Sequence, residues 1–184
     1  MTQENLRIRI TKRMLKDGLI QLLRTKSIHK ISIKEICEEA QVHRTTFYKY
    51  YGSQYDLLFD MENDVLNLID NYLISGNGCG NIPQLLLELM KFVDENTDLC
   101  RLLLSNTVDP EFPSKLFALQ SLQELLRKQS PPAYHQGDQL EYVFAFVING
   151  ILGIIRKWLR EEGPRESPRE IALLLDRFIM KLRT

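Results

Sequence analysis

Apolar residues recur at helical spacing along almost the whole chain, and no stretch alternates apolar and polar residues as a half-buried strand would. The spacing predicts helices over Leu6–Arg24, Ser53–Leu73, Pro83–Glu95, Thr97–Ser105 and Ser114–Lys128. Two further helices are expected, one from Gly137 or Asp138 to Glu162 and one from Ser167-Pro168 to Leu182. With the short helices described next, the pattern predicts an all-α protein of about nine helices.

Two short helices joined by a tight turn are predicted between Ser32 and Tyr51. Ser32 followed three residues later by Glu35 has the form of a capping box, which places the start of the first helix. Apolar residues then recur at one-turn spacing, so this helix has one buried face. The second helix is expected to begin at Arg44 and to run to Tyr51.

The composition of this second helix favours contact with nucleic acid. Residues 44–51 contain no carboxylate, two cations, two threonines and three tyrosines. The first turn of such a helix meets base edges in a major groove, and hydroxyls and ammonium groups beside it suit phosphate oxygens. Phe47 and Tyr51 are expected to point inward. We expect DNA contacts from Ser32, Lys34, His43, Arg44, Thr45, Thr46, Tyr48, Lys49 and Tyr50.

These residues resemble a known family. The run A-x-V-H-R-T-T-F-Y-K-Y-Y, with the S-x-x-E helix before it and Gly-Ser-x-x-Asp-Leu-Leu after it, looks like the helix-turn-helix of TetR-type bacterial transcriptional regulators over roughly residues 8 to 60. Three residues depart from that pattern. Gln41 stands where the family usually has glycine, Gly52 where it often has proline, and Gln54 where a phosphate-binding lysine is common.

Charge is distributed unevenly, although the whole chain is neutral. Residues 1–51 hold eleven Lys and Arg against five Asp and Glu, and the rest of the chain has the opposite excess. A basic part on an acidic remainder is expected if only the first part meets phosphate. We therefore predict a helix-turn-helix DNA-binding domain over residues 1–52 and a helical regulatory and dimerisation domain over 53–184. The basic residues that begin the first helix are either a solvated face or, as we favour for the cluster, a phosphate-binding surface: Arg7, Arg9, Lys12, Arg13 and Lys16.

The last two predicted helices carry a broad apolar surface. Gly150 and Gly153 lie on one face, where each costs about 1 kcal/mol against alanine, so close approach of another backbone is expected to compensate. That backbone belongs either to the same chain or, as the family resemblance implies, to a second copy in a four-helix dimer interface. A dimer would also match two operator half-sites about 34 to 36 Å apart. The predicted interface residues are Gly150, Ile151, Ile154, Trp158, Leu174 and Phe178.

The regulatory domain has two further open features. Aromatic residues could line an effector pocket, although aromatics at helical spacing are also ordinary core; the candidates are Phe92, Phe117, Tyr142 and Phe146. The C-terminal run N-G-I-L-G-I-I-R-K-W-L-R-E-x-G through E-S-P-R-E-I resembles a domain of TetR-type proteins from Firmicutes. Some of those proteins act as co-activators through a partner protein.

Other classes of function lack their patterns. The histidines are far apart, and no metal-ligand pair, glycine-rich phosphate loop or nucleophile elbow occurs, so we expect no catalytic residues, no metal, no cofactor and no enzyme activity. Three cysteines without pairing or metal spacing fit a reducing cytoplasm. The N-terminus lacks signal-peptide features. The apolar run Tyr142–Ile155 falls short of the roughly 20 residues that cross a bilayer, so no membrane partner is expected.

The sequence thus favours a dimeric, sequence-specific transcriptional regulator in the cytoplasm, a repressor by expectation, that binds double-stranded DNA at a palindromic operator. A small-molecule effector could release it. The alternatives are a co-activator or adaptor that works through a protein partner, and a helical protein whose first domain binds no DNA.

Overall fold

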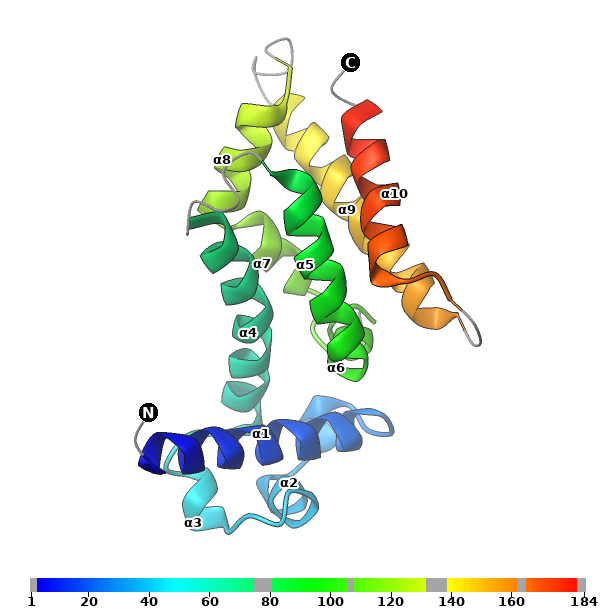
Figure 1. The fold of residues 1–184 in the computed structure, drawn as a ribbon. Coiled ribbons are helices and arrows are strands. Elements are labelled where there is room, and N and C mark those ends of the chain that lie inside the picture. The colour runs from blue at the N-terminus through cyan, green and yellow to red at the C-terminus, as the bar shows by residue number, and fades with distance from the viewer. Residues whose placement is uncertain (1–2, 75–80, 106–107, 132–138, 162–164, 182–184) are drawn as a thin grey trace.

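The computed structural model describes residues 3–74, 81–105, 108–131, 139–161 and 165–181. Within these ranges it contains ten α-helices, one short 3₁₀ helix and no strand, which confirms the all-α class with one helix more than expected (Figure 1). The glycine-rich run Ser75–Asn81 predicts a loop, of which residues 75–80 lie outside the described residues. The helix start predicted at 137 or 138 and the helix ends predicted at 162 and 182 also lie outside them.

The first helices form a small unit, which we call the head: α1 (Gln3–Leu23), η1 (Ile28–Lys30), α2 (Ile33–Glu39) and α3 (Arg44–Phe47). Helix α1 lies across the lower end of the molecule with α2 and α3 beneath it (Figure 1). Its fully buried Leu15 and Leu19 join Ile36 of α2 and Phe47 of α3 in one core. At Gly18, an added Cβ would come within 3.1 Å of the Ala40 nitrogen. Glycine therefore lets α1 pass close to the end of α2.

Helix α4 (Gln54–Ile74) follows the head in the chain and connects it to the remaining helices. The Asp56 carboxylate accepts hydrogen bonds from the backbone N–H groups of Gly52 and Ser53, and the Asp56 N–H donates to the Ser53 hydroxyl. These contacts cap the helix start. Leu57, Met61, Val65 and Ile69 then form its buried stripe.

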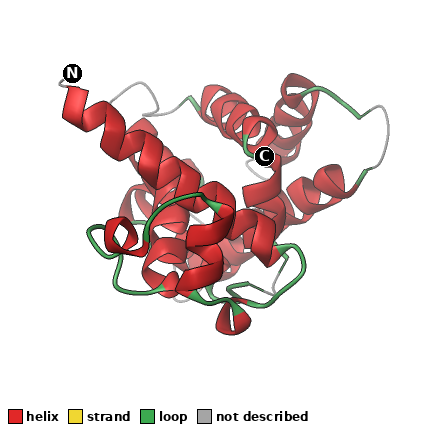
Figure 2. Ribbon diagram, turned by 90° about the horizontal axis from the view of Figure 1, so that it is seen from below, coloured by secondary structure: helices red, strands yellow, loops and turns green. Residues whose placement is uncertain are grey.

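The remaining helices form what we call the body. They are α5 (Ile82–Glu95), α6 (Thr97–Leu103), α7 (Phe112–Phe117), α8 (Gln120–Gln129), α9 (Gln139–Arg160) and α10 (Pro168–Lys181). Helix α10 packs along α5, and α9 packs against α6, α7 and α8. Seen from below, the described part of the chain consists of helices joined by loops, with no strand (Figure 2). The single helix predicted over Ser114–Lys128 is wrong, because Leu119 is extended and divides it into α7 and α8.

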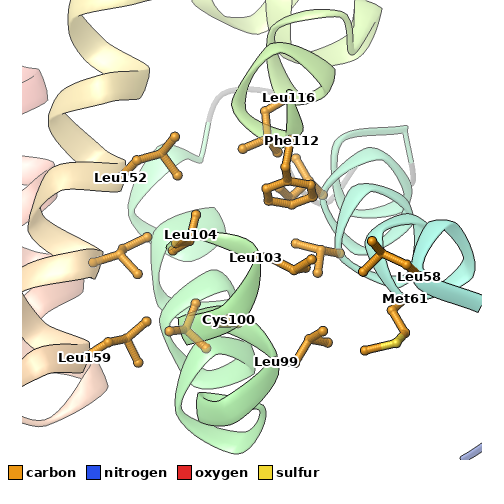
Figure 3. Packing of buried hydrophobic residues seen from close by; sticks show 14 of the residues in the cluster. Leu58, Met61, Leu99, Cys100, Leu103, Leu104, Phe112, Leu116, Leu152 and Leu159 are labelled. Atoms are coloured by element: carbon orange, nitrogen blue, oxygen red, sulfur yellow. The ribbon is translucent and has the colours of Figure 1, made fainter. Parts of the chain in front are cut away.

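The core of the body is built around α6. Leu99, Cys100 and Leu103 of α6 face Leu58 and Met61 of α4 on one side and α9 on the other, with Phe112 and Leu116 of α7 above them (Figure 3). Two reciprocal hydrogen bonds fasten α6 to α9. The Arg101 Nε donates to the Leu159 carbonyl and the Arg156 Nε donates to the Leu104 carbonyl, each at 2.8 Å.

Candidate functional site

The start of α2 is closed by the predicted capping box. The Glu35 N–H donates to the Ser32 hydroxyl oxygen at 3.3 Å, and the Ser32 N–H donates to the Glu35 carboxylate at 2.9 Å. Lys26 binds the other carboxylate oxygen of Glu35 at 2.5 Å. The hydrogen bonds from Lys26 and Ser32 lower the pKa of Glu35 to about 2. Lys34, also a predicted DNA contact, is exposed and pairs with Glu38 at 3.7 Å. Ser32 and Lys34 therefore already have partners within α2.

The turn after α2 places Gln41 in the left-handed region, with φ of 53°. The Val42 N–H donates to the Cys37 carbonyl and the Gln41 N–H donates to the Glu38 carbonyl, which is the hydrogen-bond pattern of a Schellman motif. Glycine is the residue that adopts this conformation without steric cost. Gln41, which stands where the family usually has glycine, is thus the one non-glycine residue with positive φ among the described residues.

Helix α3 is shorter than predicted. It ends at Phe47 rather than Tyr51, and residues 48–50 form a turn in which the Tyr50 N–H donates to the Phe47 carbonyl. Phe47 and Tyr51 point inward, as expected, with their ring centroids 5.6 Å apart. These two rings hold the outer residues of α3 against the head core.

The outer surface of α3 carries most of the predicted DNA contacts. His43, Arg44, Thr45, Tyr48 and Lys49 are exposed. Thr46 and Tyr50 are half-buried. Within the described ranges, Arg44 and Lys49 take part in no ion pair. The segment thus offers cations and hydroxyls free for an external anion.

The basic residues of α1 are divided by the fold. Lys12 and Lys16 face α4, where they approach Asp60 at 3.5 and 3.0 Å, and Lys16 also reaches Asp64 at 2.6 Å. These two lysines thus already have carboxylate partners within the fold, and phosphate binding by the cluster stays a prediction. The residues of α1 carry no local indication of these ion pairs, because the acidic partners lie more than 40 residues away on α4.

A network at the end of α3 joins the head to α4. The Tyr51 hydroxyl donates to Asp60 at 2.7 Å, and the Lys12 ammonium lies 5.3 Å from the Tyr51 ring centroid. Burial, with the hydrogen bond to Asp60, raises the pKa of Tyr51. Tyr51 therefore remains a neutral donor and holds the residues after α3 against the linking helix.

Helices α9 and α10 carry the predicted association surface. Tyr142, Phe146 and Phe178 are 75%, 66% and 51% exposed, and Leu174 is 39% exposed. An added Cβ at Gly150 or Gly153 would meet no atom within 4 Å. Ile151 and Ile154 are half-buried. This face therefore lacks a covering element within the described chain.

Trp158 is not part of that face, which corrects its assignment to the interface. Its side chain is 2% exposed, and its Nε1 donates to the Glu166 carbonyl at 2.8 Å. The Arg165 guanidinium lies 4.1 Å from the ring centroid. Trp158 thus holds Arg165 and Glu166, just before α10, against the body.

Helix α9 is, among the described residues, the one helix long and apolar enough to cross a membrane. One third of that apolar window is buried, and the core helix of a soluble protein has the same composition. The buried residues include Ile148, Leu152 and Ile155, which pack in the body. Its 22 residues lie within the range 137–162 that the sequence predicted for this helix.

The body encloses an apolar cavity of about 90 Å³, but the predicted effector residues do not line it. Phe92 and Phe117 are half-buried elsewhere, and Tyr142 and Phe146 lie exposed on α9. The cavity is lined instead by apolar residues of α4, α5, α6, α7, α8 and α9, among them Cys100. Apolar periodicity predicts that these residues are buried, but it does not predict that they leave a cavity between them.

No group of three or more potential metal ligands occurs in the described part of the chain. Cys37 and Cys100 are buried free thiols, and burial raises the pKa of Cys100 to about 12. At neutral pH this thiol is therefore protonated and behaves as an apolar core group.

Two family models match the chain. One, described as bacterial regulatory proteins of the tetR family, matches residues 17–61, and one described as a transcriptional regulator C-terminal region matches residues 80–181. A curated relative, the HTH-type dhaKLM operon transcriptional activator DhaS of Lactococcus lactis subsp. lactis (strain IL1403), is 33% identical over 88 residues. That match covers 47% of this chain and 45% of the relative, so it spans less than half of the relative's length.

Solved structures with the same fold extend over nearly the whole chain. A TetR transcriptional regulator from Streptococcus agalactiae 2603V has a TM-score of 0.64 at 22% identity, covering 97% of both chains. The dihydroxyacetone kinase operon activator DhaS has a TM-score of 0.59 at 23% identity, covering 93% of this chain and 94% of its own. Thermus thermophilus FadR, a repressor solved with lauroyl-CoA, has a TM-score of 0.55 at 20% identity and the same coverage. At these identities the likeness shows the fold.

Proposed function

Since the chain belongs to the tetR family of bacterial regulatory proteins and is a transcriptional regulator, we propose that it binds a palindromic operator as a homodimer. Members of this family bind DNA, typically form homodimers and are generally not enzymes. They are also cytoplasmic in general, and the same location is proposed for this chain.

The observation that carries the proposal is the exposed surface of α3. Arg44 and Thr45 stand in its first turn, where base edges are met, and Tyr48 and Lys49 follow, where phosphates are met. His43, Thr46 and Tyr50 border this group, and Ser32 and Lys34 lie at the start of α2. Residues 1–52 are proposed as the DNA-binding domain and residues 53–184 as the regulatory and dimerisation domain.

Dimerisation is supported by the uncovered face of α9 and α10. Gly150 and Gly153 leave space for a second backbone, and Phe178 and Leu174 are exposed apolar residues of α10. Ile151 and Ile154 lie on the same helix. A stable interface of this kind needs about 800 Å² on each partner.

In vitro selection of bound duplexes from a random pool tests the proposal. The expected result is a palindromic consensus with half-sites about one helical turn apart. Arg44→Ala or Thr45→Ala should then change the selected bases, whereas Lys128→Ala on the body should not. Recovery of no enriched sequence would overturn the proposed function.

The direction of regulation is proposed as repression, with release by a small effector in the body. A second candidate is activation, alone or through a protein partner, because the matched curated relative is named as an activator. A reporter placed behind the selected operator distinguishes them. Deletion of the gene raises expression if the protein represses and lowers it if the protein activates.

A further inference from the structure

Two carboxyl groups and one lysine meet where the linking helix α4 contacts α7. Glu62 of α4 is 2% exposed, and its Oε2 accepts a hydrogen bond from the Lys115 ammonium of α7 at 2.5 Å. The same ammonium donates to Asp109, in the segment before α7, at 2.6 Å. Lys115 thus bridges the two carboxyl groups, one from each side of the contact.

The charges of this cluster balance only when it holds one proton. With both carboxyl groups ionised, two negative charges would face one positive charge, and an unbalanced buried charge is costly. The carboxyl groups of Glu62 and Asp109 also lie within hydrogen-bonding reach of each other. An ionised carboxylate accepts hydrogen bonds but cannot donate one, so these two groups can bind each other only when one is protonated. A single proton therefore satisfies both the charge balance and the hydrogen bond.

Glu62 is the group that holds this proton. Its side chain is 2% exposed against 17% for Asp109, and burial raises the pKa of Glu62 although the hydrogen bond from Lys115 lowers it. Burial alone would raise the pKa of Asp109, but hydrogen bonds from Lys115 and from the Glu111 N–H lower it. A neutral Glu62 beside an ionised Asp109 and a charged Lys115 gives a cluster without net charge.

The other elements packed on α4 present different groups to it. Lys115 and Asp109 are the charged groups that act on Glu62. Helix α6 presents the apolar side chains of Leu99 and Leu103 to this part of α4 (Figure 3). Helix α8 contacts α4 two turns further on, where the Ser121 hydroxyl donates to Asp70. The lysines of α1 bind other carboxylates of α4, in the pairs Lys12–Asp60, Lys16–Asp60 and Lys16–Asp64.

We propose that Glu62, Lys115 and Asp109 form a proton-dependent joint between α4 and α7, closed while Glu62 is neutral and loosened when Glu62 loses its proton. An ionised Glu62 would face the ionised Asp109 with only Lys115 between them. Repulsion between the two carboxylates would then favour separation of α7 and the segment before it from α4.

Such a joint would act on the helix that carries the head. The head is bound to the first turns of α4 through Tyr51 and Asp60, and Glu62 lies directly after these turns. Loosening of the contact with α7 would allow α4 to tilt, and operator affinity would change as the pH rises. This regulatory consequence rests on the proposed function, whereas the proton-dependent contact itself does not.

Urea denaturation of the full chain between about pH 4.5 and 8 tests the joint, with Glu62→Gln as the variant that stays neutral. Its amide accepts from Lys115 and donates to Asp109, as the protonated carboxyl group does. A group whose pKa is raised by folding stabilises most below its unfolded pKa and loses this contribution as the pH rises through its folded pKa. We expect the unfolding equilibrium constant of the unmodified protein, divided by that of Glu62→Gln, to rise by up to about tenfold per pH unit and then to level off.

A ratio that stays level or falls across this range would overturn the proposal. The histidines titrate in both proteins, so their contribution cancels in the ratio. The matched control is Glu124→Gln on the exposed face of α8, which should follow the unmodified protein at every pH.

Amide hydrogen exchange locates the effect and needs no variant. The amides of Lys115 and Ala118 donate to carbonyls one turn earlier in the chain, as those of Ile36 and Ala40 do in the head. We expect protection factors at Lys115 and Ala118 to fall between about pH 5 and 8 by more than those at Ile36 and Ala40. Equal changes in α7 and in the head would overturn the proposal.

Fluorescence anisotropy with the selected operator across the same pH range, on the unmodified protein and Glu62→Gln, separates this proposal from the proposed function. A pH-dependent contact of α7 without any DNA binding would contradict the regulator and leave the joint standing. DNA binding with a level unfolding ratio would do the reverse.

Discussion

At the scale of single residues, Gln41 carries a conformation that its side chain disfavours. Its φ of 53° costs an L-residue about 1–2 kcal/mol, while glycine loses about 0.5–1 kcal/mol of additional chain entropy. Gln41→Gly is therefore expected to raise the free energy of unfolding by about 0.5–1 kcal/mol, measured by urea denaturation. Gln21→Gly, in the last turn of α1, is the control and should lower it.

Glu35 gives the head a dependence on acid. Its pKa falls from 4.5 to about 2 on folding, because Lys26 and Ser32 bind the ionised carboxylate. The stabilisation is therefore present above pH 4.5 and is lost as the pH falls toward about 2. Thermal unfolding followed across this range should show a loss of stability that is smaller in Glu35→Gln. An unchanged pH profile in the variant would mean that other carboxylates account for the acid sensitivity.

At the scale of elements, the exposed face of α9 and α10 determines whether the chain associates. Phe178→Glu places a charge on that face. Burying a phenyl ring in an interface is favourable, whereas burying an unpaired charge is strongly unfavourable. We expect the molar mass by sedimentation to fall from dimer to monomer at micromolar concentration. Ile74→Glu, at a more exposed apolar residue at the end of α4, should keep the dimer. A monomeric unmodified protein would contradict the proposed interface.

The positions of the helices could be predicted from apolar periodicity. Some helix ends, and which helices pack together, could not, because they depend on contacts between residues far apart in the chain. The capping box at Ser32 and the inward rings of Phe47 and Tyr51 were predictable, because their signals are local. The break at Leu119 was not, since no glycine or proline marks it. Nor was the burial of Trp158, which depends on Arg165 and Glu166 folding back over it.

The same distinction applies to the candidate DNA-binding surface. The residues of α3 were identified from composition, because residues 44–51 combine two cations, two threonines and three tyrosines and contain no carboxylate. The ion pairs of Lys12 and Lys16 with Asp60 could not be predicted, because they depend on how α4 packs against α1, which the sequence alone does not provide.

At the scale of the whole molecule, positive charge is concentrated in the head and negative charge in the rest of the chain. Only the head is therefore expected to release counterions from DNA. Lys49→Ala should weaken operator binding and reduce the slope of log Kd against log salt by about one unit, as measured by anisotropy. Lys128→Ala, an exposed lysine of α8, should change neither quantity. Equal slopes for all three proteins would remove Lys49 from the interface.

The bond from Tyr51 to Asp60 ties the head to the first two turns of α4, so the two swing together. With 21 residues at 1.5 Å each, α4 is a lever arm of about 32 Å. A tilt of about 5° at its far end then sweeps each head through about 3 Å. In a symmetric dimer the two displacements add, so the separation of the heads changes by about 6 Å and no longer matches a groove repeat of about 34 Å.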